Sequence, residues 1–123
     1  MKKRRISDFE ERLERLIEGS FARLFRGPLH PREVALQLAR AIEDNTIAGA
    51  SGREAAPTYY EIRFSTDDHV VLLAQTPDLD SQLAGEVVNY CQETGLLLLA
   101  PPEIVLIADP EVPARSVRIE AKH

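Results

Sequence analysis

TYYEIRF, residues 58–64, alternates apolar and polar side chains in the way that a β-strand with one solvent-exposed face does. Tyr60, Ile62 and Phe64 share one face of such a strand. The next residues, STDD at 65–68, supply side-chain oxygens that accept hydrogen bonds from the first backbone N–H groups of a helix. The sequence therefore predicts a strand that leads directly into a helix.

Downstream of this strand, the sequence predicts a helical crossover and two further strands. Apolar runs at residues 70–73 and 79–91 predict two helices separated at Pro77. The β-branched run EIVLIA, residues 103–108, predicts a strand buried on both faces and parallel to the first one. After the turn DPEVPA, the alternating run SVRIEA, residues 116–121, predicts a last strand that completes a hairpin with it.

Upstream, apolar side chains recur every three or four residues and predict one long amphipathic helix over residues 6–25. Ser7 and Glu10 fit a capping box at its start. Gly27 and Pro28 fit a helix end, because glycine adopts the left-handed conformation easily and proline cannot continue a helix. The apolar positions are Ile6, Phe9, Leu13, Leu16, Ile17, Phe21, Leu24 and Phe25.

A second helix is predicted from Pro31 to about Asn45, because proline is well tolerated in the first turn of a helix. Val34, Leu38 and Ile42 repeat on one of its faces. Neither helix can bury its apolar side alone, so both must pack against another layer.

The segment TIAGASGREAAP, residues 46–57, has no apolar periodicity and is predicted to be a flexible loop. The element order is then α-α-β-α-β-β. We predict an α+β fold, a small three-stranded mixed sheet with helices packed on it. The whole chain, residues 1–123, is predicted to be one domain with a basic tail at residues 1–6.

The composition is that of one globular domain, with 44% apolar and 28% charged residues. The formal net charge of -5 hides an asymmetry: residues 1–40 hold ten Lys/Arg against six Asp/Glu, and residues 41–123 hold five against fourteen. This bipolar distribution favours self-association or one oriented partner over general nucleic-acid binding, for which a basic surface is typical. The pI near 5.2 points the same way.

A single cysteine, Cys91, excludes an internal disulfide, and its position in the apolar pattern predicts core packing. The start MKKRR is followed by a charged segment rather than the apolar core of a signal peptide. The longest apolar stretch is far shorter than the roughly 20 residues of a membrane-spanning helix. We therefore expect a cytoplasmic protein.

The sequence contains little that predicts reaction chemistry. Asp67, Asp68 and His69 form a carboxylate–histidine cluster, but adjacent residues at a helix start point in different directions. Helix capping is the preferred interpretation of these residues, and no metal site is predicted. No motif places Ser, His and Asp as a nucleophilic triad. We predict a protein that is not an enzyme and needs no cofactor.

Two other functions stay open from the residues alone. GASG, residues 49–52, matches the GxxG loop with which K-homology domains hold a nucleic-acid backbone, although that loop joins two helices. Together with the basic tail it leaves a small nucleic-acid-binding α/β module as an alternative. A dimerisation or spacer domain is a further alternative.

Three stretches occur together in this chain: FEERLERLIEGSFARLFRGPLHPREVALQLARAIEDN (residues 9–45), YYEIRFSTDD (residues 59–68) and VPARSVRIE (residues 112–120). In this order, with a helix and a break at Gly95 before the last, they resemble the N-terminal domain of bacterial FhaA-type proteins. The resemblance covers residues 9–120. Its most specific residues are Phe9, Glu10, Leu13, Leu16, Glu18, Gly19, Phe21, Phe25, Pro31, Glu33, Ala35 and Leu38.

The resemblance implies a non-enzymatic interaction or adaptor domain placed N-terminal to a forkhead-associated domain, which reads phosphothreonine. It implies a role in Ser/Thr kinase signalling linked to cell-envelope synthesis and division. It also implies phosphorylation by transmembrane Ser/Thr kinases, for which Thr46, beside the predicted loop, is the candidate acceptor.

A partner protein, such as a membrane Ser/Thr kinase or an envelope-synthesis protein, is expected to dock on the outer face of the helix pair and on the sheet edge. Such a partner would recruit the domain to the inner face of the membrane. The candidate anchors are Leu29, Leu36, Tyr59 and Leu96.

Overall fold

The computed structural model describes residues 6–25, 27 and 29–123, with side chains from Phe9 onward. Three sequence predictions lie outside the described part: the basic tail before Ile6, the side chain of Ser7 in the capping box, and Pro28.

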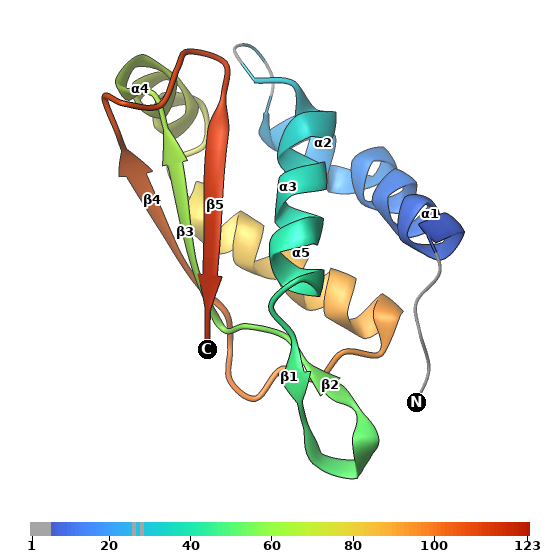
Figure 1. Ribbon diagram of the computed structural model, residues 1–123. Coiled ribbons are helices and arrows are strands. Elements are labelled where there is room, and N and C mark those ends of the chain that lie inside the picture. Colours follow the sequence, from blue (N-terminus) through green and yellow to red (C-terminus); the bar gives the residue numbers. More distant parts are fainter. Residues whose placement is uncertain (1–5, 26, 28) are drawn as a thin grey trace.

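A three-stranded mixed sheet forms one layer of the molecule (Figure 1). The central strand β3, Tyr59–Phe64, pairs in parallel with β4, Glu103–Ala108, and antiparallel with β5, Val117–Lys122. The burial of β3 side chains alternates along its whole length, as its sequence predicts. The strand at 59–64 and its parallel neighbour are therefore confirmed.

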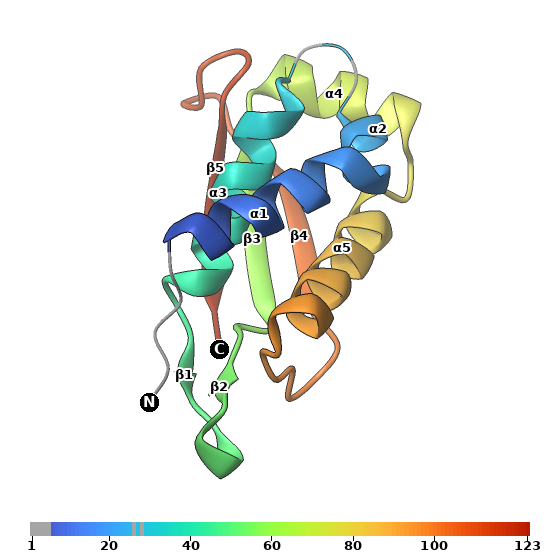
Figure 2. The same cartoon turned by 90° about the vertical axis from the view of Figure 1, so that its right-hand side faces the viewer.

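The helices cover one face of this sheet, and Figure 2 shows α1, α3 and α5 in front of it. β4 and α4 come in contact at the end of the sheet where β3 passes into α4. The predicted α+β class is confirmed. The helices are α1 (Ile6–Leu16), α2 (Ala22–Leu24), α3 (Pro31–Glu43), α4 (Thr66–Gln75) and α5 (Leu79–Thr94).

The core lies between the sheet and the helices. Tyr60, Ile62 and Phe64 project from β3 into this layer and are almost fully buried. The predicted inner positions of the second helix and Cys91 are buried as well. The other nearly inaccessible large side chains are Phe21, Phe25, Val34, Leu38, Ile42, Leu72, Leu79, Leu83 and Val87.

Helix ends follow the sequence signals in the second half of the chain. The Ser65 hydroxyl accepts a hydrogen bond from the backbone N–H of Asp68 at 3.2 Å, which caps the start of α4. Gly95 ends α5 with a φ of +78°, a conformation that glycine adopts without a Cβ clash. Gly27 likewise has a positive φ, of +102°, after the first helical segment.

The prediction of one unbroken first helix is wrong. A π-helical turn, η1 (Ile17–Phe21), separates α1 from α2, and Gly19 within it has a non-helical ψ of -148°. Glycine followed by serine is a common cause of helix kinks. The kink still leaves Leu16, Phe21 and Leu24 buried, which explains why the apolar repeat continues through it.

The predicted hairpin between the last two strands is also wrong, because β5 pairs with β3 and β4 stays at the edge. The connection between β4 and β5 crosses the end of β3 and is held there by Asp68, whose Oδ2 accepts the backbone N–H of Arg115 at 2.8 Å. Val112 in this connection is buried. The connection is thus long and anchored rather than a tight turn.

The predicted burial of residues 103–108 on both faces is wrong as well. Of the apolar residues of β4 only Ile104 is buried, while Val105, Leu106 and Ile107 are half-buried. The helices cover one face of the sheet only, so side chains on the other face of an edge strand remain in contact with solvent.

The segment predicted as a loop, residues 46–57, contains a small two-stranded hairpin. Strand β1 (Ile47–Ala48) pairs antiparallel with β2 (Glu54–Ala55) around the 3₁₀ turn η2 (Ala50–Gly52). The hairpin is tied to the segment after α5, because the N–H of Leu97 donates to the carbonyl of Glu54 at 2.9 Å. The sequence did not predict this pairing, because backbone groups form it and the small side chains of the segment show no alternation of apolar and polar residues. Its flexibility stays a prediction.

Asp68 gives a test of how the β4–β5 connection is held. Because its carboxylate is buried and accepts the Arg115 N–H, Asp68→Ala should lower the free energy of unfolding by about 1–3 kcal/mol. Asp67→Ala, which removes an exposed carboxylate from the same helical turn, should change it by about 0.5 kcal/mol or less. Urea denaturation followed by circular dichroism measures both. Equal effects of the two variants would contradict the anchoring role.

Candidate interaction surfaces

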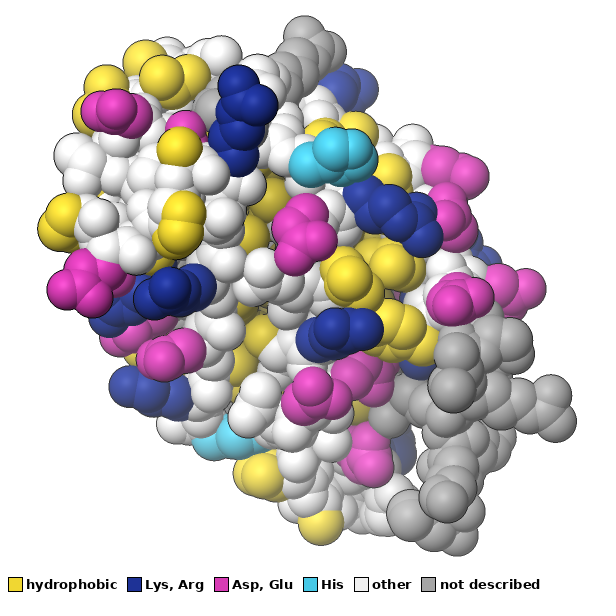
Figure 3. Space-filling view, turned by 45° about the horizontal axis from the view of Figure 1, so that its top comes forward, with side chains coloured by type: hydrophobic (Ala, Val, Ile, Leu, Met, Phe, Trp, Pro, Cys, Tyr) yellow, Lys and Arg dark blue, Asp and Glu magenta, His cyan; other side chains and the backbone are white. Residues whose placement is uncertain are grey.

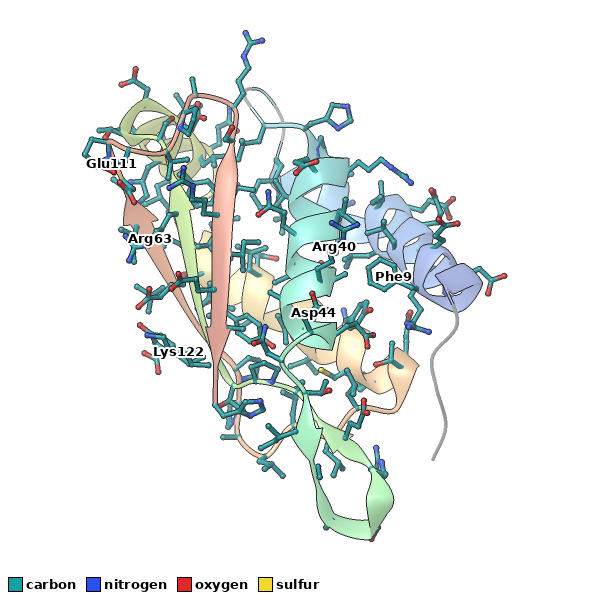
Figure 4. All side chains as sticks on the ribbon, in the orientation of Figure 1. Phe9, Arg40, Asp44, Arg63, Glu111 and Lys122 are labelled. Carbon is teal, nitrogen blue, oxygen red and sulfur yellow. The ribbon has the colours of Figure 1, made fainter. Side chains whose placement is uncertain are left out.

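None of the described helices covers the outer face of the sheet, which forms the first candidate surface, here called the open sheet face. In Figure 4 the side chains of Arg63 and Lys122 extend away from the helices on this side. The strand register and the alternation of side chains define its members. They are Tyr59, Glu61, Arg63, Glu103, Val105, Ile107, Arg118, Glu120 and Lys122.

Polar contacts hold the centre of the open sheet face in place. Arg63 lies between two carboxylates, with nitrogen–oxygen distances of 3.3 Å to Glu61 and 3.3 Å to Asp109. The Tyr59 hydroxyl donates to Glu61 at 3.1 Å, and the Lys122 ammonium lies 6.0 Å from the Tyr59 ring centre. The hydrogen bond from Tyr59 lowers the pKa of Glu61, which therefore stays ionised beside Arg63.

The four predicted anchors do not come together on one surface. Leu29 and Leu96 are both 4% exposed and belong to the core, so their prediction as surface anchors is wrong. Both leucines follow the end of a helical segment, and both pack into the hydrophobic core cluster. Tyr59 lies half-buried on the open sheet face, and Leu36 lies half-buried on α3, packed against the core.

The outer face of the helix pair is the second candidate surface. Figure 3 shows hydrophobic side chains at the surface between α1 and α3, with charged side chains beside them. Figure 4 places Phe9 and Arg40 in this region. Arg32 of α3 forms an exposed ion pair with Glu14 of α1 at 2.7 Å, so the arginines here partly pair with the protein's own carboxylates.

A part-buried polar junction joins these two helices to α5 beneath this surface. The Tyr90 hydroxyl donates to the Glu43 carboxylate at 2.7 Å, and Arg12 lies 3.4 Å from the same oxygen. Burial raises the pKa of Tyr90 well above its ordinary value, and the hydrogen bond to Glu43 raises it further. Nearby, the Ser20 hydroxyl donates to the buried Glu86 carboxylate. Sequence periodicity gave no signal for these pairs, because their members lie on different helices.

Thr46, the candidate phosphorylation site, precedes β1 and is half-buried. Its hydroxyl lies 3.4 Å from Glu54 Oε1, at the long end of hydrogen-bond distances. Thr66, in the first turn of α4, is exposed, so Thr46 is not the most accessible threonine among the described residues.

The structure describes the cluster Asp67, Asp68 and His69 and the GASG loop, which the sequence offered for metal and nucleic-acid binding. Within residues 6–25, 27 and 29–123, no group of three or more His, Cys, Asp or Glu side chains is arranged to hold a metal ion. Gly49 and Gly52 flank the turn between β1 and β2, so the GASG loop does not join two helices. Gly49 is required there, because a Cβ atom would lie 2.7 Å from the Arg53 carbonyl oxygen.

Comparison with known proteins identifies the family. The family described as FhaA, N-terminal domain, matches residues 6–120 of this chain. The chain belongs to the FhaA N-terminal domain family. This confirms the resemblance noted in the sequence, and the family is not a known family of enzymes.

Two relatives support this assignment. The "FHA domain-containing protein FhaA" of Mycobacterium tuberculosis is 34% identical over 94 residues, which is 76% of this chain and 18% of the relative's own length. A solved structure named "Rv0020c_Nter structure" superposes with a TM-score of 0.70 at 26% identity, covering 84% of this chain and 78% of that one. Its similarity supports the fold described above.

Membrane insertion has no candidate helix in the described part of the chain: none combines the length and the apolar character needed to cross a bilayer.

The part-buried junction predicts a specific stability effect. Tyr90→Phe removes a hydroxyl of a buried tyrosine that donates to the half-buried Glu43 carboxylate, and it should lower the free energy of unfolding by about 1–3 kcal/mol. Tyr59→Phe is the matched control, because it removes a hydroxyl that also donates to a glutamate but lies on the open sheet face. Its effect should be smaller than that of Tyr90→Phe, because Tyr59 is the more exposed of the two tyrosines. Urea denaturation compares the two, and a neutral Tyr90→Phe would show that the junction does not stabilise the fold.

Proposed function

We propose that this domain is a non-enzymatic protein-interaction or adaptor domain that works beside a forkhead-associated domain in Ser/Thr kinase signalling linked to the cell envelope. The family assignment and the FHA-containing relative support the signalling context. The main observation in favour of docking is the composition of the open sheet face, where half-buried Tyr59, Val105 and Ile107 lie among ordered charged side chains.

This surface has the composition of a modest protein interface. Its apolar side chains offer area to bury, and the Arg63 guanidinium is already positioned by Glu61 and Asp109. Tyrosine and arginine are the residue types enriched among binding hot spots. Because these side chains are held by each other before binding, less conformational entropy is lost when a partner docks.

Site-specific photo-crosslinking tests the docking surface. A benzophenone amino acid at position 59 should give a discrete protein adduct in the native host, and the same group at exposed Gln92 of α5 should not. The adduct partner is then purified and titrated against the domain. Tyr59→Ala should weaken that binding at least about tenfold, while circular dichroism and a cooperative melting curve show that the fold is kept. Equal crosslinking at both positions, or unchanged affinity, would contradict the proposal.

Nucleic-acid binding is the alternative that the same domain can be tested for directly. Fluorescence anisotropy with single-stranded RNA and DNA at two salt concentrations would show a steep salt dependence if phosphates were contacted. Given the pI near 5.2, we expect no binding beyond a weak contribution from the basic tail. Light scattering over a concentration series separates a dimerisation or spacer domain from a monomeric adaptor.

Phosphorylation of Thr46 remains a proposal, and it can be tested against Thr66. Incubation with the catalytic domain of a Ser/Thr kinase from the host, followed by peptide mass spectrometry, should place phosphate on Thr46, whose neighbours in the short hairpin pair through few backbone bonds. Thr46→Val should remove that modification and leave others unchanged. Phosphate on exposed Thr66 alone would overturn the assignment.

A further inference from the structure

The outer edge of β4 has unpaired backbone groups. In the parallel pairing with β3, the N–H of Glu103 donates to the carbonyl of Thr58 and the N–H of Asp109 donates to that of Phe64, each at 2.8 Å. In a parallel pair, every second residue of a strand directs its N–H and C=O groups towards the partner strand, and the residues in between direct theirs away from it. The β4 residues whose backbone groups point away from β3 are Ile104, Leu106 and Ala108. Within the described residues, no turn, loop or cap hydrogen bond reaches these groups.

Nothing in β4 blocks the addition of another strand. Its sequence EIVLIA contains no lysine or proline, and its register with β3 is continuous, without a bulge. A groove of about 300 Å³ runs beside it, where the junction of α4 and α5 approaches the strand. The groove is lined by Leu73, Pro77, Asp80, Ile104, Val105 and Leu106. A strand placed here would bury apolar side chains as well as form backbone hydrogen bonds.

The charge around this edge has one sign. Residues 64–114, which form α4, α5 and β4, contain nine Asp/Glu and no Lys or Arg. Asp80 lines the groove, Glu103 is exposed at the start of β4, and Glu111 lies just beyond its end in Figure 4. Arg63 on the adjacent strand is already bonded to two carboxylates. The edge is therefore an apolar strip with acidic ends.

We propose that the β4 edge binds an extended segment of a partner protein that alternates apolar residues and carries Lys or Arg at both ends. This inference rests on the proposed interaction function and specifies the partner's chemistry. The segment adds a fourth strand to the sheet, so main-chain hydrogen bonds provide affinity and the acidic ends select basic flanks. β4 spans about 20 Å, enough for a bound segment of about six residues.

A second copy of this chain is a poorer occupant than such a segment. Pairing of two β4 edges would bring Glu103, Glu111 and Asp80 of both copies together, and like charges at an interface are strongly unfavourable. Pairing of β4 with β5 of another copy would be head-to-tail and would build an open filament rather than a closed dimer.

Amide NMR with three synthetic peptides tests the proposal on the 123-residue chain. Each peptide has a core of alternating valine and threonine; one has lysine pairs at both ends, one glutamate pairs, and one lysine pairs with a central proline. With the first peptide, the amides of Ile104, Leu106 and Ala108 should gain protection from hydrogen exchange. Those of Val105 and Ile107 already face β3 and should not change. The glutamate and proline peptides should bind at least about tenfold more weakly.

Two sets of variants separate the roles of backbone and charge. Ala108→Pro removes an outward N–H at an exposed position and should weaken binding at least about fivefold, while the melting temperature stays close to wild type. Asp80→Asn with Glu111→Gln should remove most of the preference for lysine over glutamate flanks. Glu11→Gln with Glu14→Gln makes the same change in net charge on α1 and should leave that preference intact.

Several outcomes would overturn this proposal. The first is equal binding of the lysine and glutamate peptides, and the second is peptide-induced protection at residues outside β4. The third is protection of the β4 amides in the absence of peptide, in a sample that light scattering shows to be self-associated. If crosslinking at position 59 still identifies a partner while no peptide protects β4, only the edge proposal fails. If neither experiment detects binding, the interaction function fails as well.

Discussion

Burial of Tyr60, Ile62 and Phe64 against the helical layer is the interaction on which the other elements depend. These three side chains come from β3, which among the described strands is the one with a neighbour on each side. The strand sets the position of β4 and β5 through backbone pairing, and its three buried side chains set that of the helices through packing. A shift of register by one residue would place Tyr59, Glu61 and Arg63 in the core instead. Burying that glutamate and arginine would be far more costly than leaving them at the surface, so the register is strongly specified.

The same constraint creates the open sheet face. The helices of a domain this small suffice to cover one side of a three-stranded sheet, and the side chains of the other side then remain near solvent. Polar contacts such as those of Arg63 order that side without burying it. The central strand thus gives the fold its core on one face and an organised surface on the other.

Short sequence patterns predicted those features of the structure that are determined within a single helix, strand or turn. The alternation at residues 59–64, the cap at Ser65 and the stop at Gly95 are each read from a few neighbouring residues, and each is confirmed. The family, recognised from longer stretches, is confirmed too. What could not be read was that β5 pairs with β3 rather than with β4. The connection that leads to β5 is held by Asp68, which accepts the Arg115 N–H, a contact between residues 47 positions apart.

The surface placement of two candidate anchors, Leu29 and Leu96, was wrong for the same reason. Leu29 and Leu96 are adjacent to turns, where sequence gives no information on which side a leucine will face, and the packed core takes both. The face on which Tyr59 lies was predictable, because strand alternation places it opposite Tyr60, and its role as an anchor stays a prediction. The open edge of β4 could not be inferred from its composition, since an apolar β-branched run is expected in a buried strand. The sheet order shows that this run lies at an edge. The absence of Lys and Arg from residues 64–114 then gives that edge a preference for a basic partner segment.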